Sequence, residues 1–409
     1  MIDVRRPDDS RPPAPVHAPP RVALFAFDLP GEPRSAVAYA RSLARALAAR
    51  GSEIHLFINA PAAAPAPGVR EQQVLSTEPD LAGVPLARNL CAALSDHVAR
   101  AMREYGAFQV AHACQWSSAP AALVARRHGA VRAVVSFLDT VFSRDGACNR
   151  DERTAQVRRI EQQAAQEADA LVAGSESVRQ ELAWLYGADE KRVHTWYADA
   201  LEEEAAPDSA AARAALRLAP DDRAVAFAGD WSPAGGSDLF LELARLLRLQ
   251  EPALRFCVAV EGAGAARVEA DIKRRGLGDA FRFAPASAGA DAALAACDVA
   301  VVPARVATSY RPVFRAWRAA RPVVVARTGP THVLEAGRTG VLAFPYAQAL
   351  ADAVAPLLAD RAAAAAMGDA GRRALDHAFT WPHTAINLTK LYRATAAAPA
   401  GRPETIHGA

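Results

Sequence analysis

Short apolar runs alternate with helical patterns along most of the chain. In the first half, runs of strand length are separated by segments of about ten residues or more, whose apolar positions recur three and four apart. The expected strands are residues 21–27, 53–59, 108–113, 131–137, 169–174 and 192–197. The expected helices are residues 35–50, 88–105, 120–128, 151–167 and 176–186. This alternation predicts βαβ units and a parallel sheet.

The alternation pauses at residues 198–222, which are acidic, rich in alanine and without a strand pattern. A second series follows, with expected strands at residues 224–229, 254–260, 281–284, 298–303, 321–326 and 340–345. We therefore predict an α/β protein of two Rossmann-like, doubly wound domains, residues 21–197 and 223–377, joined by a linker over residues 198–222. Ligands of such domains bind at the carboxyl ends of the strands, so we expect a cleft between the two sheets.

The two ends of the chain differ from these domains. Residues 378–396 are expected to form a last amphipathic helix, and residues 1–20, which are proline-rich, and 397–409 are expected to be disordered tails. The start lacks the apolar stretch of a signal peptide, and no run approaches the roughly 18 apolar residues that span a bilayer. Basic positions on the helix at residues 35–50 leave a peripheral membrane contact open, although packing on the sheet is the simpler interpretation.

Composition narrows the class of partner. The 47 basic and 45 acidic residues leave a net charge of +2, which gives no reason to expect nucleic acid as a partner. The five cysteines are scattered and never in CxxC spacing, so neither a disulfide framework nor a zinc site is indicated. A reducing cytoplasm fits this pattern. Lysine is rare and arginine abundant, so a single arginine carries little weight.

Several segments together are similar to a known family. "LARALAARGSEIHLF", "EADALVAGSESVRQELAWLYGADEKRVHTWYADA", "AGDWSPAGGSDLFLELARLL", "ARPVVVARTGPTHVLEAGRTGVLAFP" and "FTWPHTAINLTKLY" resemble, in order and spacing, the family-4 glycosyltransferases of the GT-B fold, most closely the glycogen-synthase-like branch. The resemblance covers roughly residues 21–394. It implies an acceptor-side first domain, a nucleotide-sugar-side second domain and a last helix that crosses back to the first domain.

The resemblance also implies a chemistry. Members transfer a sugar from a nucleotide donor with retention and without a metal or other cofactor. Negative charge develops on the leaving diphosphate, so cationic side chains must stand there, and carboxylates must hold the hydroxyls of ribose and sugar. The family keeps these groups in recognisable motifs.

The motifs of the first domain are altered. The glycine pair of the first loop falls on Arg34 and Ser35, with Gly31 nearby. In "HACQW", Cys114 and Gln115 replace the family's imidazole and carboxylate, while His112 and Trp116 remain. We regard His112 as either a remnant of the acceptor site or a hydrogen-bonded core histidine, and Cys114 as a small buried thiol rather than a nucleophile.

The acceptor-side pattern that follows is also altered. In "LDTVFSR", Leu138 and Val141 stand in place of the family's histidine and glutamate, while Thr140 and Arg144 are retained.

The second domain departs further. Asp230 and Gly235 replace the phosphate-binding arginine and lysine, leaving Gly229, Ser232, Pro233 and Gly236 as framework. The glutamates eight apart fall on Ala307 and Arg315. His332 replaces another acidic residue, and residues 198–200 read "ADA". The remaining glycines with a candidate role near a ligand are Gly262, in a short glycine run that is either a phosphate loop or a turn, and Gly329.

Loss at so many site positions, beside intact apolar runs, predicts a degenerate enzyme. We expect a non-catalytic pseudo-glycosyltransferase of polysaccharide assembly, with a nucleotide sugar or a glycan as ligand, or with an active glycosyltransferase as partner. One alternative is an active hexosyltransferase whose anion site has moved to Arg311, Arg315 and Arg318, which share a helical face, although a solvated basic helix explains the same pattern. Another is a glycan-binding module, which predicts that Trp116 or Trp231 is exposed in the cleft.

Overall fold

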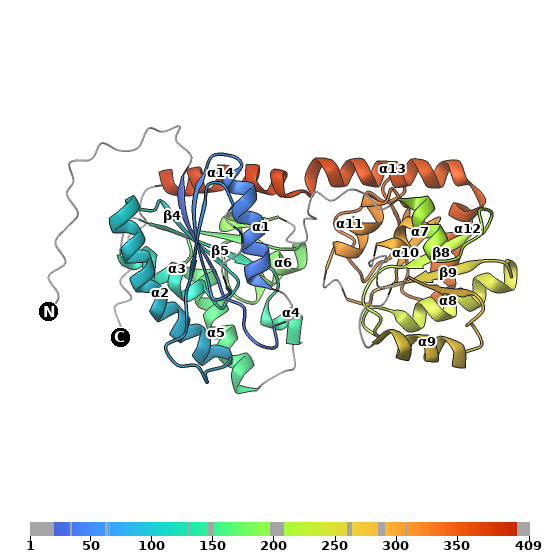
Figure 1. The fold of residues 1–409 in the computed structure, drawn as a ribbon, viewed down its shortest axis with the longest axis horizontal. Coiled ribbons are helices and arrows are strands. Elements are labelled where there is room, and N and C mark those ends of the chain that lie inside the picture. Colours follow the sequence, from blue (N-terminus) through green and yellow to red (C-terminus); the bar gives the residue numbers. More distant parts are fainter. Residues whose placement is uncertain are drawn as a thin grey trace.

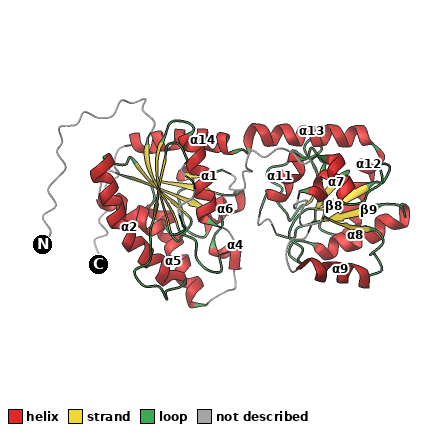
Figure 2. Cartoon of the chain, in the orientation of Figure 1, coloured by secondary structure: helices red, strands yellow, loops and turns green. Residues whose placement is uncertain are grey.

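The computed structural model describes residues 20–32, 35–61, 64, 66–128, 131–145, 151–196, 208–259, 264–284, 291–306 and 309–398. These residues form two α/β units side by side, each with a parallel sheet between helices (Figure 1). Strands occupy the centre of both units and helices their outside (Figure 2). The predicted fold class is therefore confirmed.

The first sheet has the strand order β3-β2-β1-β4-β5-β6-β7, and all pairs are parallel. Its strands are β1 (Arg21–Ala26), β2 (Glu53–Ile58), β3 (Val69–Gln73), β4 (Val110–Cys114), β5 (Arg132–Phe137), β6 (Ala170–Ala173) and β7 (Val193–Thr195). The six expected strands are all present. β3 was not expected, because this edge strand, "VREQQ", is polar and partly exposed, with no apolar run to mark it.

Helices cover both faces of this sheet. They are α1 (Ala36–Ala48), α2 (Gly83–Tyr105), α3 (Ala119–His128), α4 (Val141–Asp145), α5 (Glu152–Glu167) and α6 (Glu176–Trp184), with a 3-10 turn at Glu190–Arg192. The apolar positions of α1 pack on one face, and those of α2, α3 and α5 on the other. The strand order reverses between β1 and β4, so the carboxyl ends of these two strands form a switch point, where ligands of such sheets bind.

The second sheet has the order β10-β9-β8-β11-β12-β13, again all parallel. Its strands are β8 (Ala224–Phe227), β9 (Arg255–Val258), β10 (Phe281–Phe283), β11 (Val299–Val302), β12 (Val323–Ala326) and β13 (Val341–Ala343). Its helices are α7 (Ser209–Ala215), α8 (Ser237–Gln250), α9 (Gly264–Arg274), α10 (Ala292–Ala296), α11 (Arg311–Arg318), α12 (Ala347–Ala359) and α13 (Arg361–Ala378). The switch point lies between β8 and β11.

The expectation of a linker over the whole of residues 198–222 needs correction. Residues 209–215 form α7, and Ala212, Leu216 and Leu218 are buried in the core of the second domain. Small alanine side chains let α7 pack closely, so a composition that resembles a linker here builds part of a core. Residues 198–207 lie outside the described residues.

The last helix returns to the first domain, as predicted. α13 runs along the second domain and is followed by α14 (Trp381–Ala397), which lies on the first domain (Figure 1). Trp381, Leu388 and Tyr392 of α14 are buried in the same core as α1. In the described part of the chain, no helix combines the length and apolar character needed to cross a bilayer.

Candidate functional site

Two of the altered motif positions lie at the carboxyl ends of central strands, one in each sheet. Gln115 directly follows β4, and Asp230 follows β8 after a short loop. These two positions mark the two switch points, where the sheets offer room for a ligand.

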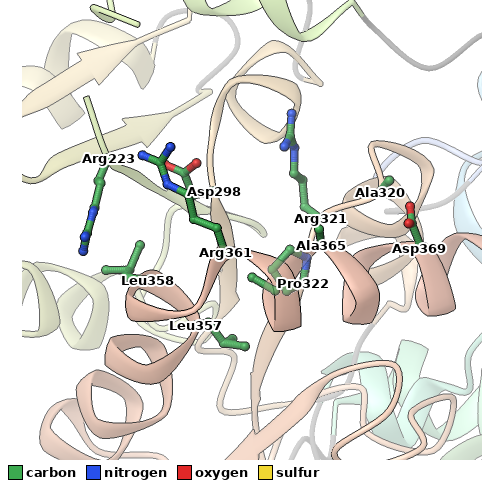
Figure 3. A pocket seen from close by; sticks show the side chains of 11 residues that line it. Arg223, Asp298, Ala320, Arg321, Pro322, Leu357, Leu358, Arg361, Ala365 and Asp369 are labelled. Carbon is green, nitrogen blue, oxygen red and sulfur yellow. The ribbon is translucent and has the colours of Figure 1, made fainter. Parts of the chain in front are cut away.

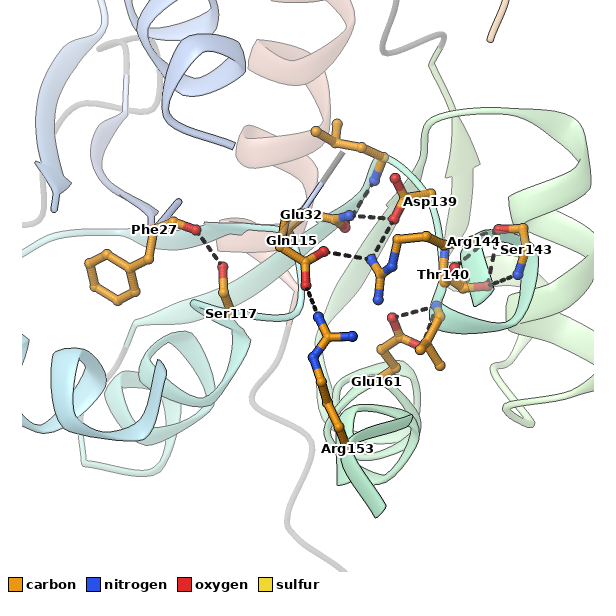
Figure 4. A network of polar contacts seen from close by, with 12 residues as sticks. Phe27, Glu32, Gln115, Ser117, Asp139, Thr140, Ser143, Arg144, Arg153 and Glu161 are labelled. Atoms are coloured by element: carbon orange, nitrogen blue, oxygen red, sulfur yellow. Dashed lines mark hydrogen bonds and ion pairs between the residues drawn. The ribbon is translucent and has the colours of Figure 1, made fainter. Parts of the chain in front are cut away.

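A network of polar contacts occupies the switch point of the first domain (Figure 4). Arg144 of α4 contacts Glu32, in the loop after β1, at 2.9 Å and Asp139, in the loop after β5, at 3.0 Å. Arg153 of α5 binds the other oxygen of Glu32 at 2.6 Å. The side chain of Arg144 is only 9% exposed. The retained arginine is therefore already neutralised by carboxylates of its own domain.

Gln115 links two loops of this network. Its side-chain amide donates to Asp139 at 2.7 Å, and its Oε1 accepts from the backbone N–H of Leu138 at 3.2 Å. Its φ of 78° lies in the left-handed region, which is unfavourable for a residue with a side chain, so the surrounding contacts must hold it there. A carboxylate at this position could not donate to Asp139. Gln115 thus acts as a structural cross-link between the segments after β4 and β5.

Thr140 and Val141 are buried beside two carboxylates that the sequence did not point out. The hydroxyl of Thr140 donates to Glu181 of α6, and the backbone N–H of Val141 donates to Glu161 of α5 at 2.9 Å. Tyr186 also donates to Glu161, at 2.6 Å. Burial raises the pKa of Glu161 to about 8 and raises that of Glu181 above its usual range.

Thr140, which the sequence retains in the acceptor-side pattern, therefore uses its hydroxyl inside the domain. A signal for Glu161 did exist: it lies on the same face of its helix as the buried residues Val157, Ala164 and Ala165.

His112 and Cys114 belong to the core rather than to a binding site. Nδ1 of His112 lies 2.6 Å from the hydroxyl of Tyr392, and Nε2 lies 2.7 Å from Oγ of Ser136. Burial lowers the pKa of His112 to about 3 and raises the pKa of the Cys114 thiol far above its usual value. Trp116 is also fully buried, which contradicts the prediction of an exposed tryptophan there.

The loop before α1 uses its own side chains at the helix N-terminus. Oγ of Ser35 accepts from the backbone N–H of Ala38 at 2.9 Å and donates to Asp28 at 2.6 Å. Asp28 also accepts from the N–H of Val37, at 3.1 Å. Two amide groups that could bind a phosphate are thereby taken. Gly31 has a φ of 83° and open space around it, whereas Arg34 lies outside the described residues.

The loop after β8 folds tightly around its glycines. The backbone N–H of Ser232 donates to the carbonyl of Asp230 at 2.8 Å, and the N–H of Gly235 donates to Oγ of Ser232 at 3.0 Å. A Cβ atom at Gly235 would overlap the carbonyl oxygen of Asp230, and one at Gly236 would overlap that of Pro303. In this conformation, position 235 cannot hold a lysine. Asp230 itself is exposed, and Gly229 has a φ of 142°.

Arg305, in the loop after β11, is the cation that touches this loop. It forms a two-pronged ion pair with Asp238, in the first turn of α8, with both contacts at 2.7 Å. Its backbone N–H donates to the carbonyl of Ala234 at 2.8 Å. The contact with Arg305 lowers the pKa of Asp238, and this is the largest effect on it. Burial acts in the opposite direction, and the backbone N–H groups of Asp238 and Leu239 lower the pKa slightly further.

The arginines of α11 are arranged differently from the anion site that the sequence allowed. Arg315 and Arg318 both bind Asp291, which directly precedes α10. Arg318 is buried, whereas Arg311 is exposed. One carboxylate thus already serves two of the three arginines. Phe314 and Trp317 pack the helix into the core of the second domain.

The remaining described candidate positions lie in the loop after β12. The backbone N–H of Gly329 donates to the carbonyl of Ala326 at 2.8 Å, in a turn directly after β12. His332, further along the same loop, is exposed and lowers the pKa of Glu176 of the first domain, where Arg179 is the larger cause. These two side chains, one from each domain, are therefore near enough to interact. Gly262 and Ala307 lie outside the described residues.

Comparison with known proteins agrees with this arrangement. A Glycosyltransferase Family 4 model matches residues 36–198, and a model of glycosyl transferases group 1 matches residues 222–360. D-inositol 3-phosphate glycosyltransferase 2 of Catenulispora acidiphila is 30% identical over 380 residues, which cover 87% of this chain and 88% of the relative. The chain belongs to glycosyltransferase family 4. The D-inositol 3-phosphate glycosyltransferase of Mycobacterium tuberculosis strain F11 is also 30% identical, over 85% of this chain and 76% of its own length.

Solved structures show that this family member has the GT-B fold. Sucrose-phosphate synthase from Thermosynechococcus elongatus superimposes with a TM-score of 0.69 at 21% identity, covering 93% of this chain and all of that one. HepE of Anabaena in complex with UDP gives a TM-score of 0.67 at 17% identity, covering 91% and 99%.

Proposed function

We propose that this family-4 glycosyltransferase has lost transfer from a nucleotide sugar and acts as a non-catalytic component of glycan assembly, on a glycan or beside an active glycosyltransferase. The observation that carries the proposal is the loop after β8. Asp230 places a negative charge where the family has a cation, and the backbone leaves no room for a side chain at Gly235.

The expected cost to catalysis is large. Removing one preorganised donor from a developing anion lowers the rate by about 10²- to 10³-fold. Two such losses exceed either alone, although they do not simply multiply. A carboxylate beside a diphosphate adds repulsion, and this repulsion is stronger in a cleft than in open water.

Contacts elsewhere in the site support the same proposal. Arg144 and Arg315, two cations near the site, are bound to Glu32, Asp139 and Asp291. The core, the strand order and the crossing helix α14 are those of a complete fold. A complete fold whose site cations are already paired fits a binding or scaffolding role.

Isothermal titration of the full chain with UDP, ADP and GDP, and with their glucose and N-acetylglucosamine derivatives, tests the proposal. We expect no nucleotide or nucleotide sugar to bind more tightly than millimolar, and no turnover. The acceptors offered in the turnover assay include D-inositol 3-phosphate, because the relatives are named for it. Micromolar binding together with sugar transfer would overturn the proposal. D230R is the informative companion variant, since it restores one cation without requiring space at position 235.

A second function is favoured by Arg305 alone. This arginine touches the loop after β8, and 38% of its side chain is exposed, so a donor diphosphate that displaced Asp238 could recruit it. The chain would then be an active transferase in which Arg305 binds the donor diphosphate in place of cations at positions 230 and 235. If the titration detects a nucleotide, R305A should abolish its binding under this second hypothesis, whereas R311A, on the exposed start of α11, should not.

A further inference from the structure

Two exposed aromatic rings stand at the carboxyl end of β13. Phe344 and Tyr346 are 57% and 54% exposed, and their ring centroids lie 6.2 Å apart with an angle of only 14° between the ring planes. The guanidinium of Arg327, which follows the neighbouring strand β12, lies 5.2 Å from the centroid of Phe344. We call Arg327, Phe344 and Tyr346 the aromatic platform.

The backbone of the platform is held in place. Pro345 separates the two aromatic residues, and the backbone N–H of Tyr346 donates to the carbonyl of Phe344 at 2.8 Å. Tyr346 is also the residue that precedes α12, and the N–H of Arg327 donates to Ala343 at 2.8 Å. Rings on a fixed turn lose little conformational entropy when a ligand binds, so the platform is preorganised.

The platform lies at the carboxyl edge of the second sheet. β12 and β13 pair in parallel, so Arg327 and Phe344 leave the sheet at the same edge. His332, in the loop that begins at Arg327, interacts electrostatically with Glu176 of the first domain. The platform therefore lies at the same edge as a loop that interacts with the first domain.

The size of the platform decides between classes of ligand. Two half-exposed aromatic side chains offer roughly 200 Å² of surface, since such a residue buries about 150–250 Å² in full. A stable protein interface needs about 800 Å² from each partner. The platform alone is too small for a protein partner and matches one or two sugar rings.

We propose that the aromatic platform binds sugar rings of a glycan chain. One face of a pyranose carries C–H groups, which pack against the negative face of an aromatic ring. The guanidinium of Arg327 and the hydroxyl of Tyr346 can hydrogen-bond the hydroxyl groups at the rim of the sugar. This site is separate from the loop after β8 and goes beyond the proposed loss of transfer. It also differs from the tryptophans that the sequence suggested, because Trp231 packs edge-on against Phe227.

An oligosaccharide array probed with the full chain, followed by titration with the oligosaccharide that is retained best, tests this site. We expect F344A and Y346A each to weaken binding about tenfold or more, and the double variant to abolish it. L249A and W184A remove exposed side chains elsewhere on the surface, 72% and 73% exposed, and should bind like the wild type.

Three results would overturn the proposal. The first is that the wild type retains no oligosaccharide, and the second is that the platform variants bind like the wild type. The third is that F344A removes binding of UDP rather than of sugar, which would make the platform a nucleobase site. Its failure is distinguishable from failure of the proposed function, because sugar transfer from a nucleotide donor is measured separately and in the absence of the oligosaccharide.

Discussion

The hydroxyl of Tyr392 on α14 lies 2.6 Å from Nδ1 of His112 on β4, inside the first domain. The other ring nitrogen of His112 lies 2.7 Å from Ser136 of β5, so one histidine joins the returning helix to two central strands. The histidine of the "HACQW" motif thus serves the docking of α14.

Y392F should destabilise the protein by about 1–3 kcal/mol, because it leaves a buried nitrogen of His112 without its partner. Urea unfolding at pH 7 measures the change. Y346F removes an exposed hydroxyl and should change the free energy of unfolding by less than about 0.5 kcal/mol. Equal effects of the two variants would show that the contact with His112 contributes nothing.

Glu161 predicts a particular dependence of stability on pH. Its folded pKa of about 8 lies above the ordinary carboxyl value, so between these values the folded state holds a proton that the unfolded state has lost. Its contribution to stability is full below the ordinary value and is lost as pH rises towards 8, by at most about 1.4 kcal/mol per pH unit.

E161Q cannot titrate, so its stability should fall less between pH 5 and pH 8 than that of the wild type. Urea unfolding at four pH values checks this. E190Q, at a side chain that is 63% exposed, should follow the wild-type curve. Parallel curves for E161Q and the wild type would mean that Glu161 is ionised in the folded protein.

G371A should separate α13 from α11. A Cβ atom at Gly371 would overlap the indole of Trp317, which is buried and donates to the carbonyl of Thr339 at 2.9 Å. We expect a loss of about 2 kcal/mol or more, read from thermal unfolding. D369A changes an exposed residue two positions earlier on the same helix and should be nearly neutral. A neutral G371A would show that Trp317 can move aside.

R315E should destabilise the second domain by about 1–3 kcal/mol, because it replaces the ion pair between Arg315 and Asp291 with two neighbouring carboxylates that repel each other. R311E, on the exposed start of the same helix, is its control. Adding A307E, at a position outside the described residues, should still produce no sugar transfer, since Asp230 and Gly235 remain. Activity in the double variant would show that the rest of the donor site is intact.

The buried central strands could be predicted from the sequence, whereas the edge strand β3 could not. Val299–Val302 and Val323–Ala326 are continuous apolar runs because both faces of a central parallel strand are covered. β3 has a polar sequence because it lies at an edge. α7 looked like a linker because alanine is common both in surface segments and in tightly packed helices.

The sequence singled out Thr140, Arg144 and Arg315 as candidate positions, but it could not show what these side chains contact. Their partners, Glu181, Glu32 and Asp291, are 24 to 112 residues away along the chain. Nothing in a local motif reveals such pairs, because the fold alone brings them together. The exposure of Phe344 and Tyr346 depends in the same way on the turn at Pro345.

The loop after β8 sets unequal limits on adding positive charge to it. Asp230 can be replaced by a basic residue in one substitution, because it is exposed. A lysine at position 235 would be rejected by the carbonyl of Asp230 before its charge could act. The peptide at 230 would have to rotate before any side chain could fit at position 235. The two positions therefore differ in what they tolerate: a basic residue fits at 230 without a backbone change, whereas at 235 it requires one.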